Sequence, residues 1–182
     1  MSILPVLEIP NDILLQKAEA VPAVTDEIKK ILADMLETMY ATHGVGLAGN
    51  QVGLLKRLVV LDCADRDAEP DPIKMVNPKI IWKSDEMICH NEGCLSIPRQ
   101  YADVTRHAEV EVEYTDENGE IKRRRTGGLL AIGIQHELDH LEGILFIDYV
   151  SPLKRKMMLK RLEKNRKRAP LNKELPVLKI NW

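Results

Sequence analysis

An apolar run that ends in two histidines restricts the folds open to this chain more than any other stretch. Residues 127–134 carry no charge, and residues 135–140 read Gln-His-Glu-Leu-Asp-His. The length of the run and the glycine stop at Gly143 predict a buried helix. His136 and His140 are four residues apart and share one face of that helix. The fold must therefore enclose the helix and leave space beside two imidazoles.

The pattern His-Glu-x-x-His is typical of metal-dependent hydrolases, although it also arises by chance in charged amphipathic helices. Two imidazoles one turn apart can reach one ion at roughly 2.0–2.1 Å, and Glu137 can hold the water that the ion activates. Neither familiar protease pattern is completed. The third-histidine position of a metzincin is Phe146, and the glutamate of a thermolysin-like site would have to be Glu163, inside a basic run. A third ligand must come from elsewhere in the chain.

Cys94 is the candidate for that third ligand. A thiolate with two imidazoles would complete a three-ligand site with one position open for water. Cys94 lies between Gly93 and Leu95, where the sequence passes from polar to apolar. Cys63 and Cys89 have no such setting and are predicted to be buried thiols. The other histidines have no partner at ligand spacing and are predicted to be ordinary: His43, His90 and His107.

Composition fits one globular domain in the cytoplasm. The 182 residues are 45% hydrophobic and 30% charged, enough to bury a substantial core. The N-terminus has no basic region followed by an apolar stretch, and no run reaches membrane-spanning length, so neither secretion nor membrane insertion is expected. Three cysteines, an odd number, favour reduced thiols. We expect one catalytic domain over residues 1–168 and a tail over 169–182.

Strand and helix patterns predict an α+β fold, with antiparallel strands packed around the buried HExxH helix and a basic C-terminal helix. Val110, Val112 and Tyr114 alternate with glutamates, which is typical of a strand with one buried face, and a hairpin turn follows at 118–119. Other strands are predicted at 57–61, 73–76, 80–82, 101–105 and 121–126.

Two N-terminal elements are also predicted. Asn11 can cap a short helical turn through Lys17. Thr25, followed by two acids, begins a helix that should run to about His43. Its apolar side chains fall on one stripe that we expect to face the core: Ile28, Ile31, Leu32, Met35 and Met39.

The last predicted helix, residues 152–168, is strongly basic. Ser151 is its predicted cap, and Pro152 is its first residue. The helix carries nine Lys or Arg and one acid, so the net charge of the rest of the chain is −10. An ordinary amphipathic surface helix, packed by its Leu and Met side chains, is one interpretation. The contrast between this helix and the acidic rest of the chain favours the other interpretation, which is attraction to a polyanion.

Three glycines within residues 44–51 interrupt the chain after the first long helix. The segment follows a helix and lacks the lysine of a phosphate loop, so it does not indicate nucleotide binding. It is either a flexible connector or an extended edge on which a ligand lies, with Gln51 aimed into a site.

Three segments together, 44–51, 92–96 and 135–140, resemble the signature motifs of peptide deformylases in order and spacing. The pair Glu-Gly-Cys-Leu-Ser and Gln-His-Glu-x-Asp-His is the specific part, and the resemblance extends to about residue 165. The chain departs from the family pattern at Gly49, where alanine is usual, and at His90-Asn91. These departures concern the substrate pocket rather than the chemistry.

The resemblance implies a metal-dependent hydrolase that removes the formyl group from N-formylmethionine of nascent polypeptides and releases formate. It implies Fe²⁺ as the ion, with Zn²⁺ or another divalent metal able to substitute. Glu137 would be general base and then acid, and the Gln51 amide with the backbone N–H of Leu95 would stabilise the oxyanion. The implied metal ligands are Cys94, His136 and His140.

The resemblance also implies how substrate and partner bind. The peptide would add a strand near Gly46, with the methionine side chain in a pocket lined by Val45, Leu129 and Ile132. The basic helix at 152–168 would dock on the ribosome near the exit tunnel, and no DNA or membrane partner is expected.

Two charged residues have possible supporting roles. Arg106 can pair with Glu92 and fix the loop that carries Cys94, and the alternative is a plain surface charge. Asp139 is either an orienting residue or a solvated one.

Two alternatives remain open at this stage. A metallopeptidase that cleaves internal peptide bonds would share the metal chemistry. A nucleic-acid-binding protein with structural zinc would need a fourth protein ligand, and the sequence shows none.

Overall fold

The computed structural model describes residues 2–65 and 68–168, and the predicted tail at 169–182 lies outside them. The long helices are α1 (Asp26–Ala41), α2 (Gly128–Leu141) and α3 (Pro152–Arg168). The strands are β1 (Gly46–Ala48), β2 (Leu58–Leu61), β3 (Ile73–Lys83), β4 (Met87–Cys94), β5 (Ile97–His107), β6 (Glu109–Thr115) and β7 (Ile121–Gly127). Three short 3-10 turns are η1 (Asp12–Leu15), η2 (Gly49–Val52) and η3 (Phe146–Asp148).

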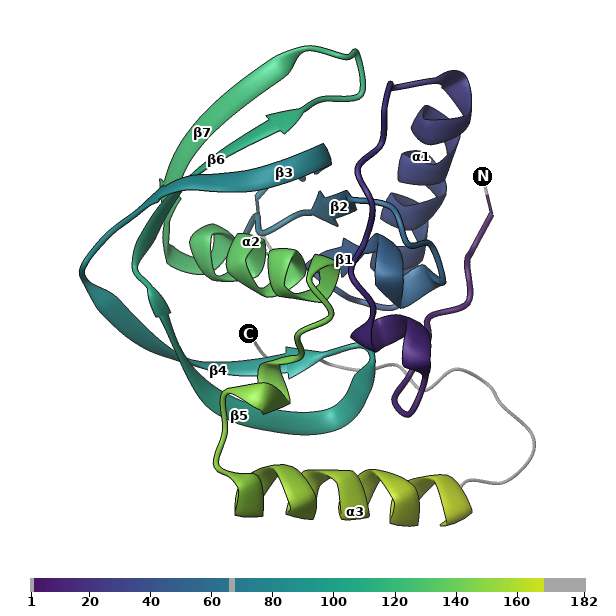
Figure 1. Ribbon diagram of the computed structural model, residues 1–182, viewed down its shortest axis with the longest axis vertical. Coiled ribbons are helices and arrows are strands. Elements are labelled where there is room, and N and C mark those ends of the chain that lie inside the picture. Colours follow the sequence, from purple (N-terminus) through teal and green to yellow (C-terminus); the bar gives the residue numbers. More distant parts are fainter. Residues whose placement is uncertain (1, 66–67, 169–182) are drawn as a thin grey trace.

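The strands form two antiparallel sheets. One has five strands in the order β1-β2-β3-β6-β7, and the other is the β4–β5 hairpin. Helix α2 lies between them (Figure 1), which confirms the α+β class. Val110 and Val112 are fully buried on β6, and Asp116 accepts hydrogen bonds from the backbone N–H groups of Asn118 and Glu120 in the β6–β7 turn.

Helix α2 is buried along most of its length, as its apolar sequence predicts. Ten of its 14 residues are buried, and its apolar face joins β2, β3 and β6 in one cluster that includes Val59, Met75 and Ile134. The chain leaves the helix through Gly143 in the left-handed region (φ +74°), which confirms the predicted glycine stop.

Helix α1 and η1 also follow the sequence. Thr25 accepts a hydrogen bond from the N–H of Ile28, and Asn11 accepts one from the N–H of Ile13. Four members of the predicted stripe are buried, and Ile31 is half-buried beside them. This stripe packs against β1 and β2, so its core role is confirmed.

Two strand predictions are corrected. The separate strands expected at 73–76 and 80–82 are one strand, β3, which continues through Pro78 by shifting register against β6. The strand expected at 101–105 is the middle of the longer β5, whose partner β4 begins at Met87.

Helix α3 begins as predicted, but it buries fewer of its apolar side chains than an amphipathic helix would. The Ser151 hydroxyl accepts a hydrogen bond from the N–H of Lys154. Only Met158 and Leu162 are buried, against the β4–β5 hairpin. Three other apolar side chains stay exposed: Leu153, Met157 and Leu159.

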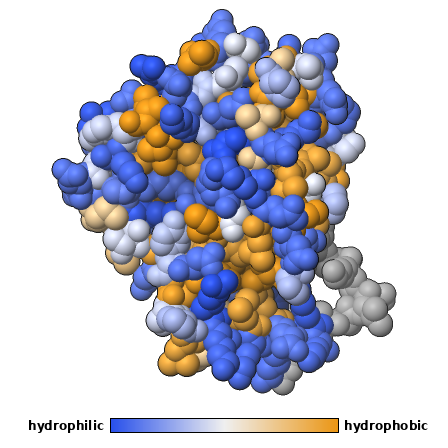
Figure 2. All heavy atoms as spheres, viewed as in Figure 1, coloured by the Kyte–Doolittle hydropathy of each residue, from blue (hydrophilic) through white to orange (hydrophobic). Residues whose placement is uncertain are grey.

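In Figure 2, hydrophobic side chains gather in the middle of the face, whereas the lower edge, which α3 forms, is mostly hydrophilic. None of the helices in the described part of the chain combines the length and apolarity needed to span a bilayer.

Candidate metal centre

Two histidines on α2 form the first part of the site. His136 and His140 are both buried, and their ring centroids lie 5.1 Å apart. They come together because four residues make about one helical turn. Phe146 stacks against His136 with 6.2 Å between ring centroids. The position that would hold a third histidine in a metzincin is therefore an apolar wall of this site.

Cys94 completes a group of three possible ligands. It is the last residue of β4 and pairs with Ile97 across a tight turn into β5. Its Sγ lies 3.2 Å from Nε2 of His140, and the ligand atoms of the three residues all lie within 4.8 Å of one another. A buried thiolate with two imidazoles suits Zn²⁺ or Fe²⁺.

Glu137 gives independent support for an ion here. It is 3% exposed, and its Oε2 has no hydrogen-bond partner among the described residues. A buried carboxylate oxygen without a protein partner suits a site where water completes its contacts. Burial raises the pKa of Glu137 to about 7, which suits a group that takes up and returns a proton near neutrality.

The backbone of β1 lies directly against Glu137. A Cβ placed on Gly46 would lie 2.4 Å from Oε1 of Glu137 and 2.9 Å from a methyl group of Leu61, so only glycine allows this approach. β1 is the end strand of its sheet and pairs with β2 on one side. The three-glycine segment is thus an ordered edge beside the site rather than a flexible connector.

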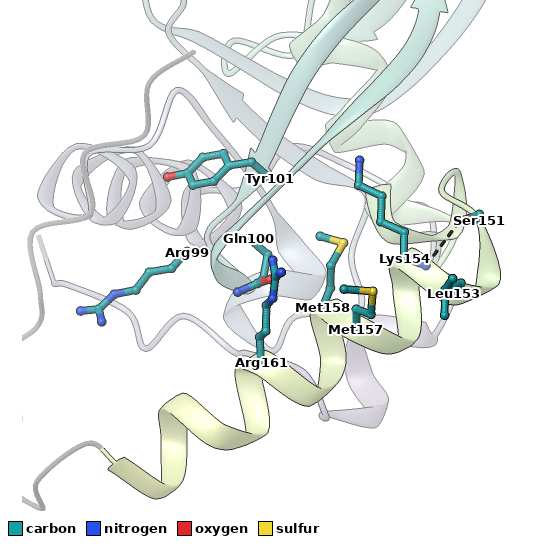
Figure 3. A pocket seen from close by; sticks show the side chains of 9 residues that line it. All are labelled: Arg99, Gln100, Tyr101, Ser151, Leu153, Lys154, Met157, Met158 and Arg161. Carbon is teal, nitrogen blue, oxygen red and sulfur yellow. Dashed lines mark hydrogen bonds between the residues drawn. The ribbon is translucent and has the colours of Figure 1, made fainter.

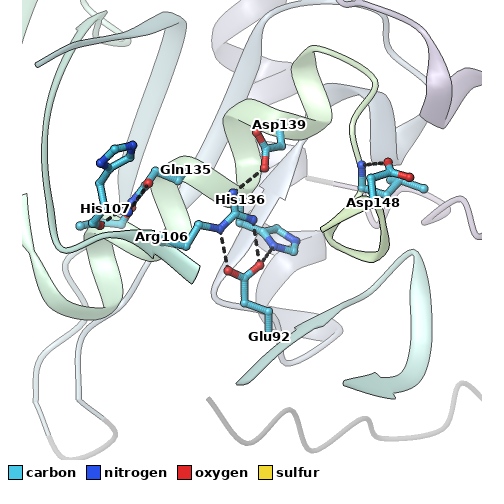
Figure 4. A network of polar contacts seen from close by, with 9 residues as sticks. Glu92, Arg106, His107, Gln135, His136, Asp139 and Asp148 are labelled. Atoms are coloured by element: carbon cyan, nitrogen blue, oxygen red, sulfur yellow. Dashed lines mark hydrogen bonds and ion pairs between the residues drawn. The ribbon is translucent and has the colours of Figure 1, made fainter. Parts of the chain in front are cut away.

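A network of charged side chains contacts Nδ1 of His136 (Figure 4). Glu92 is fully buried and accepts hydrogen bonds from Nε and Nη2 of Arg106, at 2.7 and 2.9 Å. Nδ1 of His136 lies 2.8 Å from the same carboxylate. Arg106 also donates to Asp139 at 2.5 Å and lies over the ring of Tyr149. The predicted Arg106–Glu92 pair is confirmed, and Asp139 is an orienting residue.

This network holds a proton on Nδ1 of His136. Burial opposes ionisation of Glu92, but its hydrogen bonds with Arg106 and His136 outweigh burial and lower its pKa to about 2. An ionised carboxylate only accepts hydrogen bonds, so Nδ1 of His136 donates to it. Burial lowers the pKa of His136, but its contacts with Cys94 and Glu92 outweigh burial and raise that pKa well above its ordinary value. A metal ion bound at Nε2 would replace the second proton of the ring.

Gln51 reaches the site from η2. Its Oε1 accepts a hydrogen bond from the N–H of Ala48, which turns Nε2 towards Sγ of Cys94 at 3.5 Å and Oγ of Ser96 at 3.3 Å. Leu95 follows Cys94 directly and is buried, so its backbone N–H belongs to the same turn. Ser96 was not singled out from the sequence, although its place in the Glu-Gly-Cys-Leu-Ser motif is the available signal.

The residues expected to line a substrate pocket flank these groups. Val45 and Gly46 precede and begin β1, and the backbone carbonyl of Val45 accepts a hydrogen bond from the N–H of Asp62. Leu129 is half-buried in the first turn of α2, and Ile132 is buried one turn before His136. The structure therefore places Gly46 directly beside Glu137, and Leu129 and Ile132 on the helix that carries Glu137.

The remaining cysteines and histidines stay outside the site. Cys89 is exposed on β4, so the prediction of a buried thiol is wrong there, because the side chain falls on the outer face of the alternating strand. Cys63 is partly buried, and burial raises the pKa of its thiol to about 12. Nδ1 of His107 lies 2.7 Å from the carbonyl oxygen of Ser84. Within the part of the chain that the structure describes, the only cluster with ligand spacing is the one formed by Cys94, His136 and His140.

Comparisons with family models, relatives and solved structures all point to the same family. A model of the family described as polypeptide deformylase matches residues 3–156. A peptide deformylase of Rhizorhabdus wittichii is 48% identical over 172 residues, 92% of this chain and 97% of the relative. One of Phenylobacterium zucineum is 45% identical over 169 residues, 93% of this chain and all of the relative. The crystal structure of peptide deformylase from Ehrlichia chaffeensis superposes with a TM-score of 0.88 at 35% identity, covering 92% of this chain and 98% of that one.

Proposed function

The chain belongs to the polypeptide deformylase family, whose members are metal-dependent hydrolases, and from that membership we propose how its own residues carry out the reaction. The substrate is a nascent polypeptide that begins with N-formylmethionine, and the products are formate and a free amino terminus. The observation that carries the proposal is the convergence of Cys94, His136 and His140 within 4.8 Å beside the buried Glu137.

Cys94, His136 and His140 would hold one divalent ion, which would supply Lewis-acid activation of a water molecule and of the formyl carbonyl. Glu137 takes the proton of the attacking water and passes it to the departing amine, a cycle that its pKa of about 7 permits near neutral pH. Phe146 and the buried walls of α2 limit access of bulk solvent to these groups.

Gln51 and Leu95 would stabilise the negative charge that develops on the formyl oxygen. The side-chain amide of Gln51 is already oriented by its hydrogen bond to Ala48, so little reorganisation is needed when charge appears. The backbone N–H of Leu95 would be the second donor.

The peptide would lie as an added strand on the free edge of β1, beside Gly46. Glycine lets two backbones approach closely there. Val45, Leu129 and Ile132 offer apolar side chains for the methionine. The departure from the family at Gly49 has a local reason, since a Cβ there would lie 2.5 Å from the carbonyl oxygen of Lys56.

An assay of formate release tests the reaction. The protein is expected to release formate from a formyl-Met peptide and to leave a peptide with both ends blocked intact. Cleavage of the blocked peptide without formate release would instead support a metallopeptidase.

Fe²⁺ is the ion we propose for the cell, with Zn²⁺ as a stable substitute that binds a thiolate and two imidazoles well. Protein purified without oxygen is expected to contain iron and to lose activity in air as the iron and the thiolate oxidise. Full and lasting activity after aerobic purification, with one equivalent of zinc, would contradict this assignment.

Helix α3 is the proposed contact with the ribosome near the exit tunnel. Its basic side chains within residues 154–167 are exposed, whereas the rest of the chain is acidic. Reversal of four of these charges should abolish co-sedimentation with ribosomes at low salt and change turnover of a short formyl-Met peptide little. Unaltered sedimentation would refute the docking role.

A further inference from the structure

A strap formed by residues 7–18, which includes η1, crosses the chain segments that build the metal centre (purple in Figure 1). The N–H of Leu7 donates a hydrogen bond to the carbonyl oxygen of Gln51 at 2.7 Å. The N–H of Ile9 donates one to the carbonyl oxygen of Ser96 at 3.0 Å. Gln51 is one proposed oxyanion donor, and Ser96 lies in the turn that carries the other. Two N–H groups of the strap thus bridge the two donors.

The strap also binds the end of α2. The N–H of Ala18 donates to the carbonyl oxygen of Leu141 at 2.8 Å, and the last carbonyl groups of a helix have no partner within the helix. Leu141 directly follows His140, a proposed metal ligand. The chain after the helix also lies close to the strap, because a Cβ on Gly143 would lie 2.5 Å from the carbonyl oxygen of Leu15. The strap therefore contacts all three site segments next to their functional residues.

Buried side chains hold the strap in place. Leu14 is fully buried and Ile9 is 7% exposed, and both belong to the apolar cluster that contains Cys94 and Met158. Figure 3 shows Met158 pointing from α3 towards the β4–β5 hairpin, so α3 closes this cluster from outside. Because its side chains pack in one fixed cluster, the strap presents its N–H groups from a rigid support.

Asn50 ties η2 to the strap a second time. Its side chain is fully buried, and its Nδ2 donates to the carbonyl oxygen of Gln16 at 2.6 Å. Gln51 is therefore held at its own carbonyl by Leu7 and through its neighbour by Gln16. Within residues 2–65 and 68–168, no backbone hydrogen bond joins η2 directly to the turn at 94–97. The strap is the backbone connection between the two.

We propose that the strap is a positioning element of the reaction, in which the N–H groups of Leu7 and Ile9 set the distance between the Gln51 amide and the backbone N–H of Leu95. Both donors must lie where the negative charge appears, because an oxyanion hole works through donors that are already in place. Leu7 and Ile9 are positioning residues, since neither is proposed to touch the ion or the substrate. The inference rests on the proposed roles of Gln51 and Leu95.

Single-atom changes in the backbone of the full chain test the strap. Codon suppression with the α-hydroxy acid analogue of leucine at Leu7 replaces that N–H by an oxygen and keeps the side chain. The matching ester at Ile9 removes the second donor. An ester at Glu8 is the control, because the side chain of Glu8 is exposed and its N–H donates no hydrogen bond within the described part of the chain.

The esters at Leu7 and Ile9 should each lower kcat for a formyl-Met peptide by about 10- to 10²-fold, because small misplacements of catalytic groups are costly. KM and metal content should stay within about twofold, since only stabilisation of the transition state is lost. The Glu8 ester should leave kcat unchanged. In a Gln51→Ala background the Leu7 ester should lower kcat by less than about twofold, because the group that it misplaces is absent.

The position of the Gln51 amide can also be read without turnover. The chain has four glutamines, so selective ¹⁵N labelling of the zinc-loaded protein gives few side-chain amide signals, and Gln51→Ala identifies the signal of Gln51. The Leu7 ester should move this signal. The signal of Gln135, whose amide is held by the backbone of His107, should stay in place.

Equal kcat in the Leu7 and Glu8 esters would overturn the proposal, and so would an unmoved Gln51 signal. Equal losses from the Leu7 ester with and without Gln51 would also overturn it, because they would show a general effect on the fold. Failure of the proposed function gives different results: a wild type that releases no formate, or unchanged turnover in Gln51→Ala. In those cases the Gln51 signal alone decides whether the strap positions this side chain.

Discussion

Replacing Arg106 by leucine should destabilise the protein by about 3–5 kcal/mol, the cost of breaking a buried ion pair by removing one partner. The change would leave the carboxylate of Glu92 fully buried without its two hydrogen bonds from Arg106 and would also remove the contact with Asp139. The lowered pKa of Glu92 gives a second value for this loss of stability. A decrease from 4.5 to about 2 corresponds to roughly 3 kcal/mol at 1.36 kcal/mol per unit, and Arg106 and His136 share this effect.

Urea denaturation at pH 7 in the presence of a chelator measures this loss without a contribution from metal release. Arg123→Leu is the matched control, since Arg123 pairs with Glu113 on the exposed face of the β6–β7 hairpin. That variant should lose less than about 1 kcal/mol. A loss of the same small size in Arg106→Leu would refute the reasoning.

The pH dependence supplies a second test of the same variant. Because the folded-state pKa of Glu92 is lowered, its pairing stabilises the native protein fully above pH 4.5, and this contribution disappears as the pH falls towards 2. The difference in unfolding free energy between wild type and Arg106→Leu should therefore narrow as the pH falls from about 4.5 towards 2. A constant gap would mean that Arg106 acts through packing alone.

Three substitutions, with two cysteine controls, test the groups around the proposed metal site. Glu137→Gln should keep the metal and lower turnover by roughly 10²–10⁴, the range for a lost acid–base group; loss of the metal would make Glu137 a ligand. Cys94→Ser should weaken metal binding while Cys63→Ser and Cys89→Ser do not, and elemental analysis of the three proteins decides this. Gly46→Ala should lower turnover by about 10² with metal retained, because the new methyl group displaces the Glu137 carboxylate; unchanged turnover would show that this approach is not needed.

The sequence predicts those parts of the molecule that depend on local pattern. Helix α2 with its glycine stop, the cap at Thr25 and the β6–β7 hairpin follow from spacing and turn chemistry. The Arg106–Glu92 pair was also a prediction from the sequence, and the structure confirms it. The grouping of Cys94 with two histidines came from the chemistry of three-ligand sites, and the structure brings their ligand atoms together.

The sequence does not predict features that depend on tertiary pairing. Separate strands were predicted at 73–76 and 80–82, but a register shift against β6 carries one strand, β3, through Pro78. Strand β4 was missed because its outer face carries polar and exposed side chains, including Cys89, and only the pairing with β5 makes it a strand. The hydrogen bond from His136 to Glu92 links residues 44 positions apart, and no local signal reports it.

The buried face of α3 lies in the same apolar cluster as Cys94 and Ile97. Met158 and Leu162 thus help to support the turn that carries a proposed metal ligand, while the cations of the helix point elsewhere. Natural selection would act on these two faces separately. Lysine and arginine should exchange freely on the outside as the proposed docking surface drifts, but the two apolar positions should tolerate few replacements. A lineage that abandoned docking could lose the charges one by one and would still have to keep the helix.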